Sequence, residues 1–217
     1  MNRCIEGTLR TSLFAHLSKS PTAFCRDILV RTMTVIISLL RGVNVGGHNK
    51  IKMDALRNLY ESLGLQGAQT YVQSGNVVFR TKEQDLSRLA KRIEGALGKQ
   101  FAVRADVVLR TSSELRGVIS RNPFAKRREL DPKKLLVAFF KEKPNAECLQ
   151  NALKIKTAPE ELCIDGGVAY IYFPNGMARP KMSWPAIERA LKDTSTGRNW
   201  NTVTKLFELA QALETSA

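Results

Sequence analysis

The chain has 217 residues, of which 34 are Lys or Arg and 20 are Asp or Glu, so its formal net charge at pH 7 is +14. This length suffices for one domain or two small ones, and the charge favours nucleic acid or phosphorylated metabolites as partners unless it only serves solubility. No apolar stretch has the length of a membrane span, and the four cysteines show no metal-ligand spacing. We therefore expect a cytoplasmic protein with no metal site, no cofactor and no membrane partner.

The first 32 residues differ in composition from the rest of the chain. Residues 1–32 contain five basic but only two acidic residues, and their apolar spacing is irregular. This composition resembles a transit peptide, whereas a start codon chosen too far upstream would explain it equally, because Met33 directly precedes the first regular strand. We expect a disordered leader or an over-extended start over 1–32.

A first α+β half is predicted over residues 33–111. Apolar residues recur every three or four positions in two segments, which indicates helices, and four short apolar runs indicate strands. Ser74-Gly75-Asn76 is a tight-turn signature between two of these strands, which predicts a hairpin. The predicted elements are a strand over 34–40, a glycine loop over 41–50, a helix over 53–63, strands over 69–73 and 77–80, a helix over 84–97 and a strand over 103–109.

Residues 112–217 repeat this β-α-β-β-α-β order more loosely and end in an additional amphipathic helix. The order is typical of a split β-α-β, ferredoxin-like sandwich. We therefore predict an α+β protein of two ferredoxin-like (α/β-plait) subdomains, 33–111 and 112–217, with a C-terminal helix. The predicted elements of the second part are a short helix that is capped by Ser112 or Ser113 and ends at about 120, strands over 135–140, 161–165 and 168–173, helices over 145–153 and 184–192, a short extended segment over 196–200, and a final helix that starts at Asn201 or Thr202 and ends at 213.

Three polar segments are candidates for one binding site. The loop after the first strand interleaves glycines with cations, and glycine lets backbone amides approach an anion closely. The hairpin turn adds neutral donors, and the start of the last helix adds amides with a partial positive charge. We expect Arg41, Asn76 and Arg198 to converge on a cavity that holds a small anionic or phosphorylated ligand. The candidate ligand-binding residues are Arg41, Asn44, Gly46, Gly47, Lys50, Gln73, Ser74, Asn76, Arg198, Asn199, Thr202 and Lys205.

Other interpretations stay open. The glycines, Ser74 and Asn76 also suit tight turns, and Thr202 also suits a helix cap. No catalytic residues are assigned, because the sequence shows neither a phosphate-binding glycine motif nor a complete catalytic triad. The alternatives are a small-substrate enzyme that uses the same pocket, and a non-specific nucleic-acid binder that uses the basic segment 126–134. The latter lacks the aromatic motif of RNA-binding sheets.

The segments LLRGVNVGG (39–47), TYVQSGNVVF (70–79) and RNWNTVTKL (198–206) occur in this order. Together they resemble the uncharacterised bacterial family named domain of unknown function 1697 (DUF1697), and the resemblance extends from Met33 to Leu213. It implies two ferredoxin-like subdomains, but no activity, because none is established for the family. The leader before Met33 departs from the family pattern.

Overall fold

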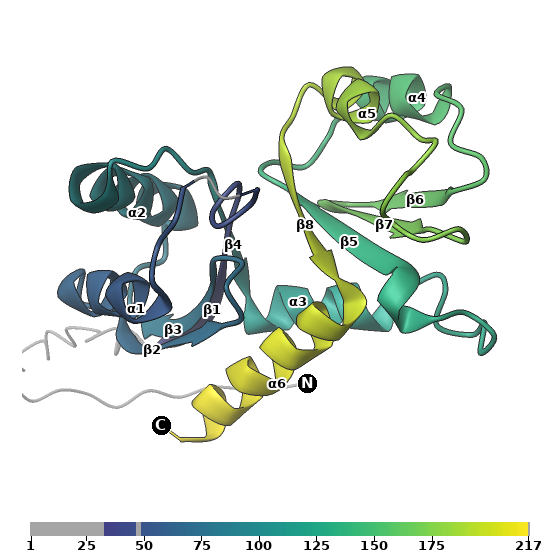
Figure 1. The fold of residues 1–217 in the computed structure, drawn as a ribbon. Coiled ribbons are helices and arrows are strands. Elements are labelled where there is room, and N and C mark those ends of the chain that lie inside the picture. The colour runs from purple at the N-terminus through teal and green to yellow at the C-terminus, as the bar shows by residue number, and fades with distance from the viewer. Residues whose placement is uncertain (1–32, 47–48, 217) are drawn as a thin grey trace, which may run out of the picture. The chain divides into compact units, whose positions relative to one another are not determined.

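A computed structural model describes residues 33–46 and 49–216. The expected leader over 1–32 and the candidate ligand residue Gly47 lie outside the described residues. Within the described ranges the chain forms a mixed α+β fold with two four-stranded antiparallel sheets and six α-helices (Figure 1). None of the described helices is both long enough and apolar enough to cross a membrane.

The first half contains four strands and two helices, which are β1 (Thr34–Leu40), α1 (Met53–Ser62), β2 (Gln66–Tyr71), β3 (Asn76–Thr81), α2 (Leu86–Phe101) and β4 (Val107–Thr111). The sheet order is β2-β3-β1-β4, and all neighbouring strands are antiparallel. Apolar side chains of α1 and α2 pack on one face of this sheet and form the first core cluster with Ile36 and Phe79.

The second half repeats this order between two further helices, and its elements are α3 (Ser112–Ser120), the short 3-10 helix η1 (Pro132–Lys134), β5 (Leu135–Phe140), α4 (Ala146–Leu153), β6 (Glu161–Asp165), β7 (Val168–Tyr172), α5 (Trp184–Leu191), β8 (Ser195–Asn199) and α6 (Trp200–Thr215). The sheet order is β6-β7-β5-β8, again antiparallel throughout. Helices α4 and α5 cover one face of this sheet, with Phe140 and Ile187 in their common core.

The middle core cluster contains residues from both halves. Ile37 of β1 and Val137 of β5 belong to it, together with Leu115 of α3 and Leu206 of α6. Strands β1 and β5 are therefore buried on both faces, which explains why their sequences are continuous apolar runs and do not alternate with polar residues. The end of each of these strands lies beside the hairpin turn of its own half, because the Leu40 amide donates to the Gly75 carbonyl oxygen and the Phe140 amide to that of Gly167. The candidate site lies at the end of β1.

Two helix starts differ from the sequence prediction. The cap of α3 is Thr111, which forms a capping box with Glu114, and the cap of α6 is Asn199, whose side chain accepts from the Asn201 amide. The prediction placed these caps one to three residues later. In both cases the helix follows directly on an edge strand, so the last strand residue also serves as the cap.

Candidate functional site

An open cavity of about 390 Å³ lies where the glycine loop after β1 meets β8 and α5. Three of the candidate residues, Arg41, Ser74 and Arg198, line it together. The other lining residues are Leu40, Gly42, Val43, Val45, Leu136, Ala138, Trp184, Glu188, Ser195, Thr196 and Gly197. The cavity thus brings together the glycine loop and the hairpin turn of the first half with the last strand of the second half.

The guanidinium of Arg198 on β8 is buried and uses all five of its N–H donors. Nη2 donates to the carbonyl oxygens of Leu40 (2.8 Å) and Ser74 (3.1 Å) in the first half. Within its own strand, Nη1 donates to Thr196 Oγ1 (2.7 Å) and to the Gly197 carbonyl oxygen (2.8 Å). The remaining donor, Nε, binds the side-chain oxygen of Asn76. Arg198 therefore joins the end of β1 and the β2–β3 turn to β8.

All five acceptors around Arg198 are neutral. No carboxylate among the described residues pairs with it, and burial lowers the pKa of Arg198 to about 10. The guanidinium is still charged at neutral pH, so one wall of the cavity carries a positive charge that no protein carboxylate neutralises. A charge removed from water without a counterion is destabilised, and an anion that enters the cavity would offset this cost.

Arg41 lies on the same cavity but has a carboxylate partner. Its Nη2 is 3.2 Å from Glu188 Oε2, and the exposed fractions of the two side chains are 37% and 14%. Glu188 is held in place because its Oε1 accepts from both the amide and the hydroxyl of Ser195, each at 2.8 Å. Trp184 Nε1 in turn donates to the Ser195 hydroxyl at 3.1 Å. One edge of the Arg41 guanidinium makes no bond to any described residue and can reach a ligand.

Asn44 closes the glycine loop and does not line the cavity. Its side-chain oxygen accepts from the Ile51 amide (2.8 Å), and its Nδ2 donates to the Ile51 carbonyl oxygen (3.0 Å). Gly42 has a φ of 72°, a left-handed conformation that glycine adopts without strain, and its carbonyl oxygen accepts from Asn49 Nδ2 at 3.0 Å. These bonds fix the course of the loop and so hold Arg41 at the cavity.

Gly75 allows the hairpin turn to approach β1. A Cβ atom at this position would lie 2.8 Å from the Leu40 Cβ atom, and its φ of 69° also favours glycine. The Gly75 carbonyl oxygen accepts from the Leu40 amide at 2.9 Å. Asn76, next in the chain, is fully buried and donates to Ser74 Oγ and the Tyr71 carbonyl oxygen, so its amide positions Arg198 and does not reach the cavity.

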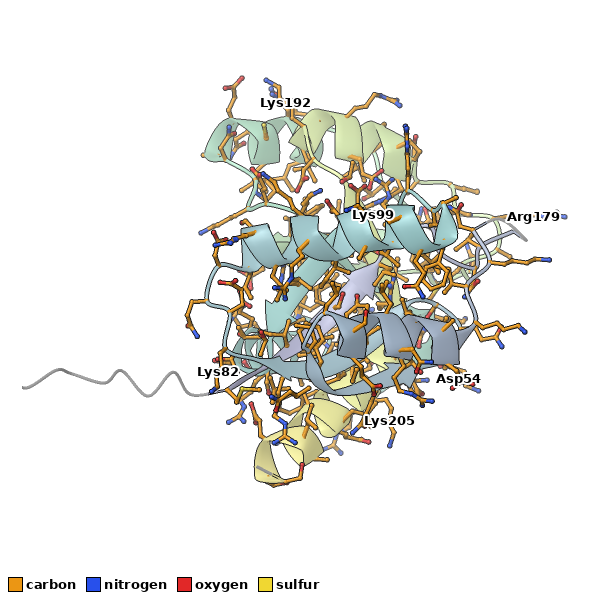
Figure 2. All side chains as sticks on the ribbon, turned by 90° about the vertical axis from the view of Figure 1, so that its left-hand side faces the viewer. Asp54, Lys82, Lys99, Arg179, Lys192 and Lys205 are labelled. Carbon is orange, nitrogen blue, oxygen red and sulfur yellow. The ribbon has the colours of Figure 1, made fainter. Side chains whose placement is uncertain are left out.

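The remaining candidates lie elsewhere. Asn199 caps α6 and donates to the Lys133 carbonyl oxygen, whereas Thr202 is half-buried on the first turn of that helix. Lys205 lies on the surface of α6, where it pairs with Glu208 at 2.8 Å (Figure 2). Three further candidates are exposed and do not line the cavity, namely Gly46, Lys50 and Gln73.

Arg198 has a counterpart in the first half, and its contacts are reciprocal. Arg110 is the fourth residue of β4, and Arg198 is the fourth residue of β8. Arg110 pairs with Ile37 of β1, and Arg198 likewise pairs with Val137 of β5. Arg110 Nη2 donates to the Phe140 carbonyl oxygen (2.6 Å) at the end of β5 and lies 3.4 Å from that of Gly167 in the β6–β7 turn. Each half therefore inserts an arginine against the strand end and hairpin of the other.

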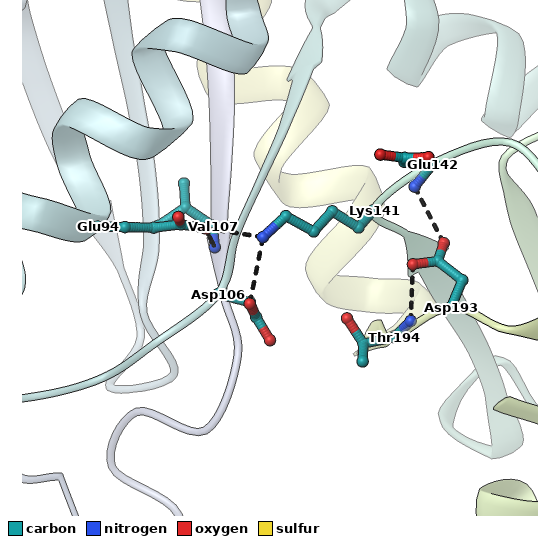
Figure 3. A network of polar contacts seen from close by, with 7 residues as sticks. All are labelled: Glu94, Asp106, Val107, Lys141, Glu142, Asp193 and Thr194. Carbon is teal, nitrogen blue, oxygen red and sulfur yellow. Dashed lines mark hydrogen bonds and ion pairs between the residues drawn. The ribbon is translucent and has the colours of Figure 1, made fainter. Parts of the chain in front are cut away.

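The ion pairs are reciprocal as well. Lys141 follows β5 as Arg41 follows β1, and its Nζ contacts Glu94 of α2 at 3.1 Å and Asp106 at 3.2 Å (Figure 3). Glu94 Oε1 also accepts from the first amide of β4, as Glu188 Oε1 accepts from the first amide of β8. Glu188 on the cavity wall was not among the predicted site residues. It lies 10 residues before Arg198, whereas Glu94 lies 16 residues before Arg110, so only the contacts in the structure show that the two glutamates correspond.

No group of three His, Cys, Asp or Glu side chains in the described part of the chain has the geometry of a metal site. The cavity residues available to a ligand are thus cationic, hydroxylic and amide groups together with one carboxylate. This set suits binding and orientation of a polar molecule through hydrogen bonds.

Comparisons with known proteins relate this chain to a family of known sequence and to solved structures. The family model described as "Protein of unknown function (DUF1697)" matches residues 33–170. A solved structure described as that of the conserved bacterial protein SP0830 from Streptococcus pneumoniae is similar with a TM-score of 0.63 and 21% sequence identity, over 82% of this chain and 99% of that chain. At this identity the similarity concerns the fold alone. No curated protein is significantly similar to the chain.

Proposed function

The chain belongs to the DUF1697 family of proteins of unknown function, and we propose that it binds a small anionic ligand in the cavity between Arg41 and Arg198. The observation that carries this proposal is the buried guanidinium of Arg198, which has only neutral partners and lies on the cavity wall. With Arg41 included, two cations and one carboxylate line the cavity, so it has an excess of positive charge. A phosphate or carboxylate group is the ligand chemistry that this excess favours.

The two arginines would act differently on such a ligand. Arg198 has no free donor, so it contributes through its charge at short range. Arg41 has donors that no described residue uses, and it can form a direct charge-assisted hydrogen bond to the anion. Such bonds contribute about 1.5–3 kcal/mol each, which corresponds to roughly a tenfold to hundredfold change in affinity.

The proposal is tested by titrating the protein with inorganic phosphate and with citrate at constant ionic strength, while the unfolding temperature is followed. A ligand that binds only the folded state raises this temperature as its concentration increases. Arg41→Gln should weaken the response about tenfold or more. It should change the stability of the free protein by less than about 1 kcal/mol, because the Arg41–Glu188 pair is partly exposed.

Arg57→Gln is the matched control, because Arg57 also pairs with a carboxylate, Asp54 at 2.9 Å, but lies on α1 and does not line the cavity. It should bind the anion as the unmodified protein does. Equal effects of the two substitutions, or no response to either anion, would contradict the proposal.

We also propose that each half is a ferredoxin-like subdomain and that the protein is cytoplasmic. The repeated β-α-β-β-α-β order and the strand orders β2-β3-β1-β4 and β6-β7-β5-β8 support the first proposal. Cys148 and Cys163, the two cysteines in the described part of the chain, form no disulfide with each other, which supports a reducing compartment.

A further inference from the structure

A second cavity, of about 220 Å³, lies beneath the basic loop between α3 and β5. It shares no lining residue with the first cavity. Three aromatic rings and two arginines contribute to its walls, and its lining residues are Asn122, Phe124, Ala125, Arg127, Arg128 and Leu130 together with Asp131, Pro132, Leu135, Tyr172 and Trp200.

Asn122 presents an unused hydrogen-bond donor to this cavity. The residue is 9% exposed, and its side-chain oxygen accepts from the Phe124 amide at 2.9 Å, which fixes the orientation of its amide group. Its Nδ2 has no partner among the described residues. Nδ2 is open to solvent at the cavity wall, so it can donate to a ligand that accepts a hydrogen bond there.

Tyr172 adds a second polar atom within an aromatic wall. Its side chain is 7% exposed, and its hydroxyl has no partner in the described part of the chain. The Tyr172 ring packs against Phe124 with a centroid distance of 6.1 Å and a tilt of 37°. Trp200, half-buried at the start of α6, is the third ring on the cavity. Flat apolar rings combined with fixed polar atoms suit a planar ligand that both stacks and accepts or donates hydrogen bonds.

The volume limits what can enter. Drug-sized ligands occupy pockets of about 300–1,000 Å³, so a cavity of about 220 Å³ has room for a single ring system and not for a large molecule. Any further part of a ligand must therefore lie outside, on the rim.

The rim carries two arginines and the carboxylate of Asp131, which accepts a hydrogen bond from the Lys133 amide at 2.9 Å. Arg127 is neutralised by Glu129 (3.1 Å) and Glu161 (2.6 Å). Arg128 is exposed and forms no ion pair with any described residue, although it lines the cavity. A phosphate that is attached to the bound ring would meet this guanidinium, which is well suited to phosphate recognition.

We propose that this second cavity binds a nucleotide, with the base against its aromatic wall and the phosphate on Arg128. Asn122 Nδ2 and the Tyr172 hydroxyl bind polar atoms at the edge of the base. Asn122 Nδ2 can only donate, so it requires an acceptor on the base, and every nucleobase has at least one. The site is independent of the anion cavity, so either proposal can fail without the other.

The test is isothermal titration of the protein with AMP, GMP, CMP and UMP, and with the corresponding nucleosides. At least one nucleotide should bind, and its nucleoside should bind about tenfold more weakly, because it lacks the phosphate. Asn122→Asp keeps the oxygen that accepts from the Phe124 amide and replaces only the free donor, and Tyr172→Phe removes only a hydroxyl. Each substitution should weaken nucleotide binding by about tenfold, with an unfolding temperature near that of the unmodified protein.

Arg128→Gln should reduce nucleotide affinity to the level of the nucleoside and leave nucleoside affinity unchanged. Arg88→Gln, at an exposed position on α2 that does not line the cavity, is the charge-matched control and should have no effect. The proposal is overturned if no nucleotide binds at millimolar concentration. It is also overturned if binding survives both Asn122→Asp and Tyr172→Phe, or if only oligonucleotides bind.

Discussion

Arg41 and Arg198 lie on one cavity, but their environments give the two side chains different roles. Arg198 is buried and fully hydrogen-bonded, with contacts to both halves, whereas Arg41 is partly exposed and has unused donors. Substitution of Arg198 should therefore lower the stability of the protein more than substitution of Arg41. Ligand binding through direct hydrogen bonds should instead depend more on Arg41.

Replacement of Arg198 by Met should lower the free energy of unfolding by about 3 kcal/mol or more, because each buried acceptor that loses its donor costs about 1–3 kcal/mol. The substitution leaves buried acceptors at Leu40, Ser74 and Asn76 without a donor. Arg198→Lys should recover only part of this loss, because an ammonium group cannot reproduce the planar arrangement of five donors. Urea denaturation at pH 7 measures the free energy of unfolding of both variants. Arg41→Met is the control, and it should lower this free energy by less than about 1 kcal/mol. A loss below about 1 kcal/mol for Arg198→Met would mean that the bonds to the first half do not form.

At the scale of elements, the packing of α1 on the first sheet includes a buried polar contact. The Tyr60 hydroxyl and Ser38 Oγ are 2.8 Å apart, and both side chains are fully buried. Burial raises the pKa of Tyr60 well above its usual value of about 10, and the hydrogen bond to Ser38 opposes this shift only in part. Burial likewise raises the pKa of Tyr170 on β7 to about 12.

These shifts predict loss of stability at alkaline pH. Above about pH 10 the unfolded chain releases the Tyr60 proton, whereas the folded state retains it. The free energy of unfolding is therefore unaffected by this group below about pH 10 and falls as the pH rises above that value. Tyr60→Phe should reduce that slope by up to about 1.4 kcal/mol per pH unit, and it should cost about 1 kcal/mol at pH 7 through loss of the hydrogen bond.

Urea denaturation between pH 7 and pH 11 measures this slope. Tyr71→Phe, which removes a hydroxyl from a half-buried position on β2, is the control and should keep the slope of the unmodified protein. An unchanged slope in Tyr60→Phe would mean that Tyr60 ionises within the folded protein.

Element boundaries were predictable where an apolar run coincides with a paired strand. The predicted strands over 34–40, 135–140 and 161–165 have the observed bounds. Strand β4 instead begins at Val107, four residues after the predicted start, because Val107 pairs with Leu40, the last residue of β1. The residues before it extend beyond the end of β1 and have no strand partner. The apolar pattern of a segment does not reveal where its neighbour ends.

At the scale of the whole molecule, the two halves are joined by a common core and by reciprocal polar contacts. Arg110 and Arg198 occupy the same position in corresponding strands, and the pairs Lys141–Glu94 and Arg41–Glu188 are equivalent. These contacts support an origin of the chain by duplication of one α+β unit, as does the repeated element order.

Because the middle core cluster contains residues of both sheets, we expect the two halves to unfold in one cooperative transition. Native-state hydrogen exchange should give equal opening free energies for the central amides of β1 and β5. Arg110→Met should lower both values by the same amount, although Arg110 belongs to the first half. A decrease confined to β4 and its neighbours would contradict cooperative unfolding, and Arg88→Met on the exposed face of α2 is the control that should change neither value.

The sequence by itself determined the family, the element order and the repeated halves, because hydrophobic periodicity and turn residues are local signals. Only the tertiary structure decided that Arg41, Ser74 and Arg198 line one cavity, and which of the candidate side chains are free to meet a ligand. The reason is that the partners of Arg198 include the carbonyl oxygens of Leu40 and Ser74, and a backbone carbonyl is the same in every residue. The same holds for the second cavity, where Asn122 Nδ2 is available to a ligand because no acceptor among the described residues reaches it.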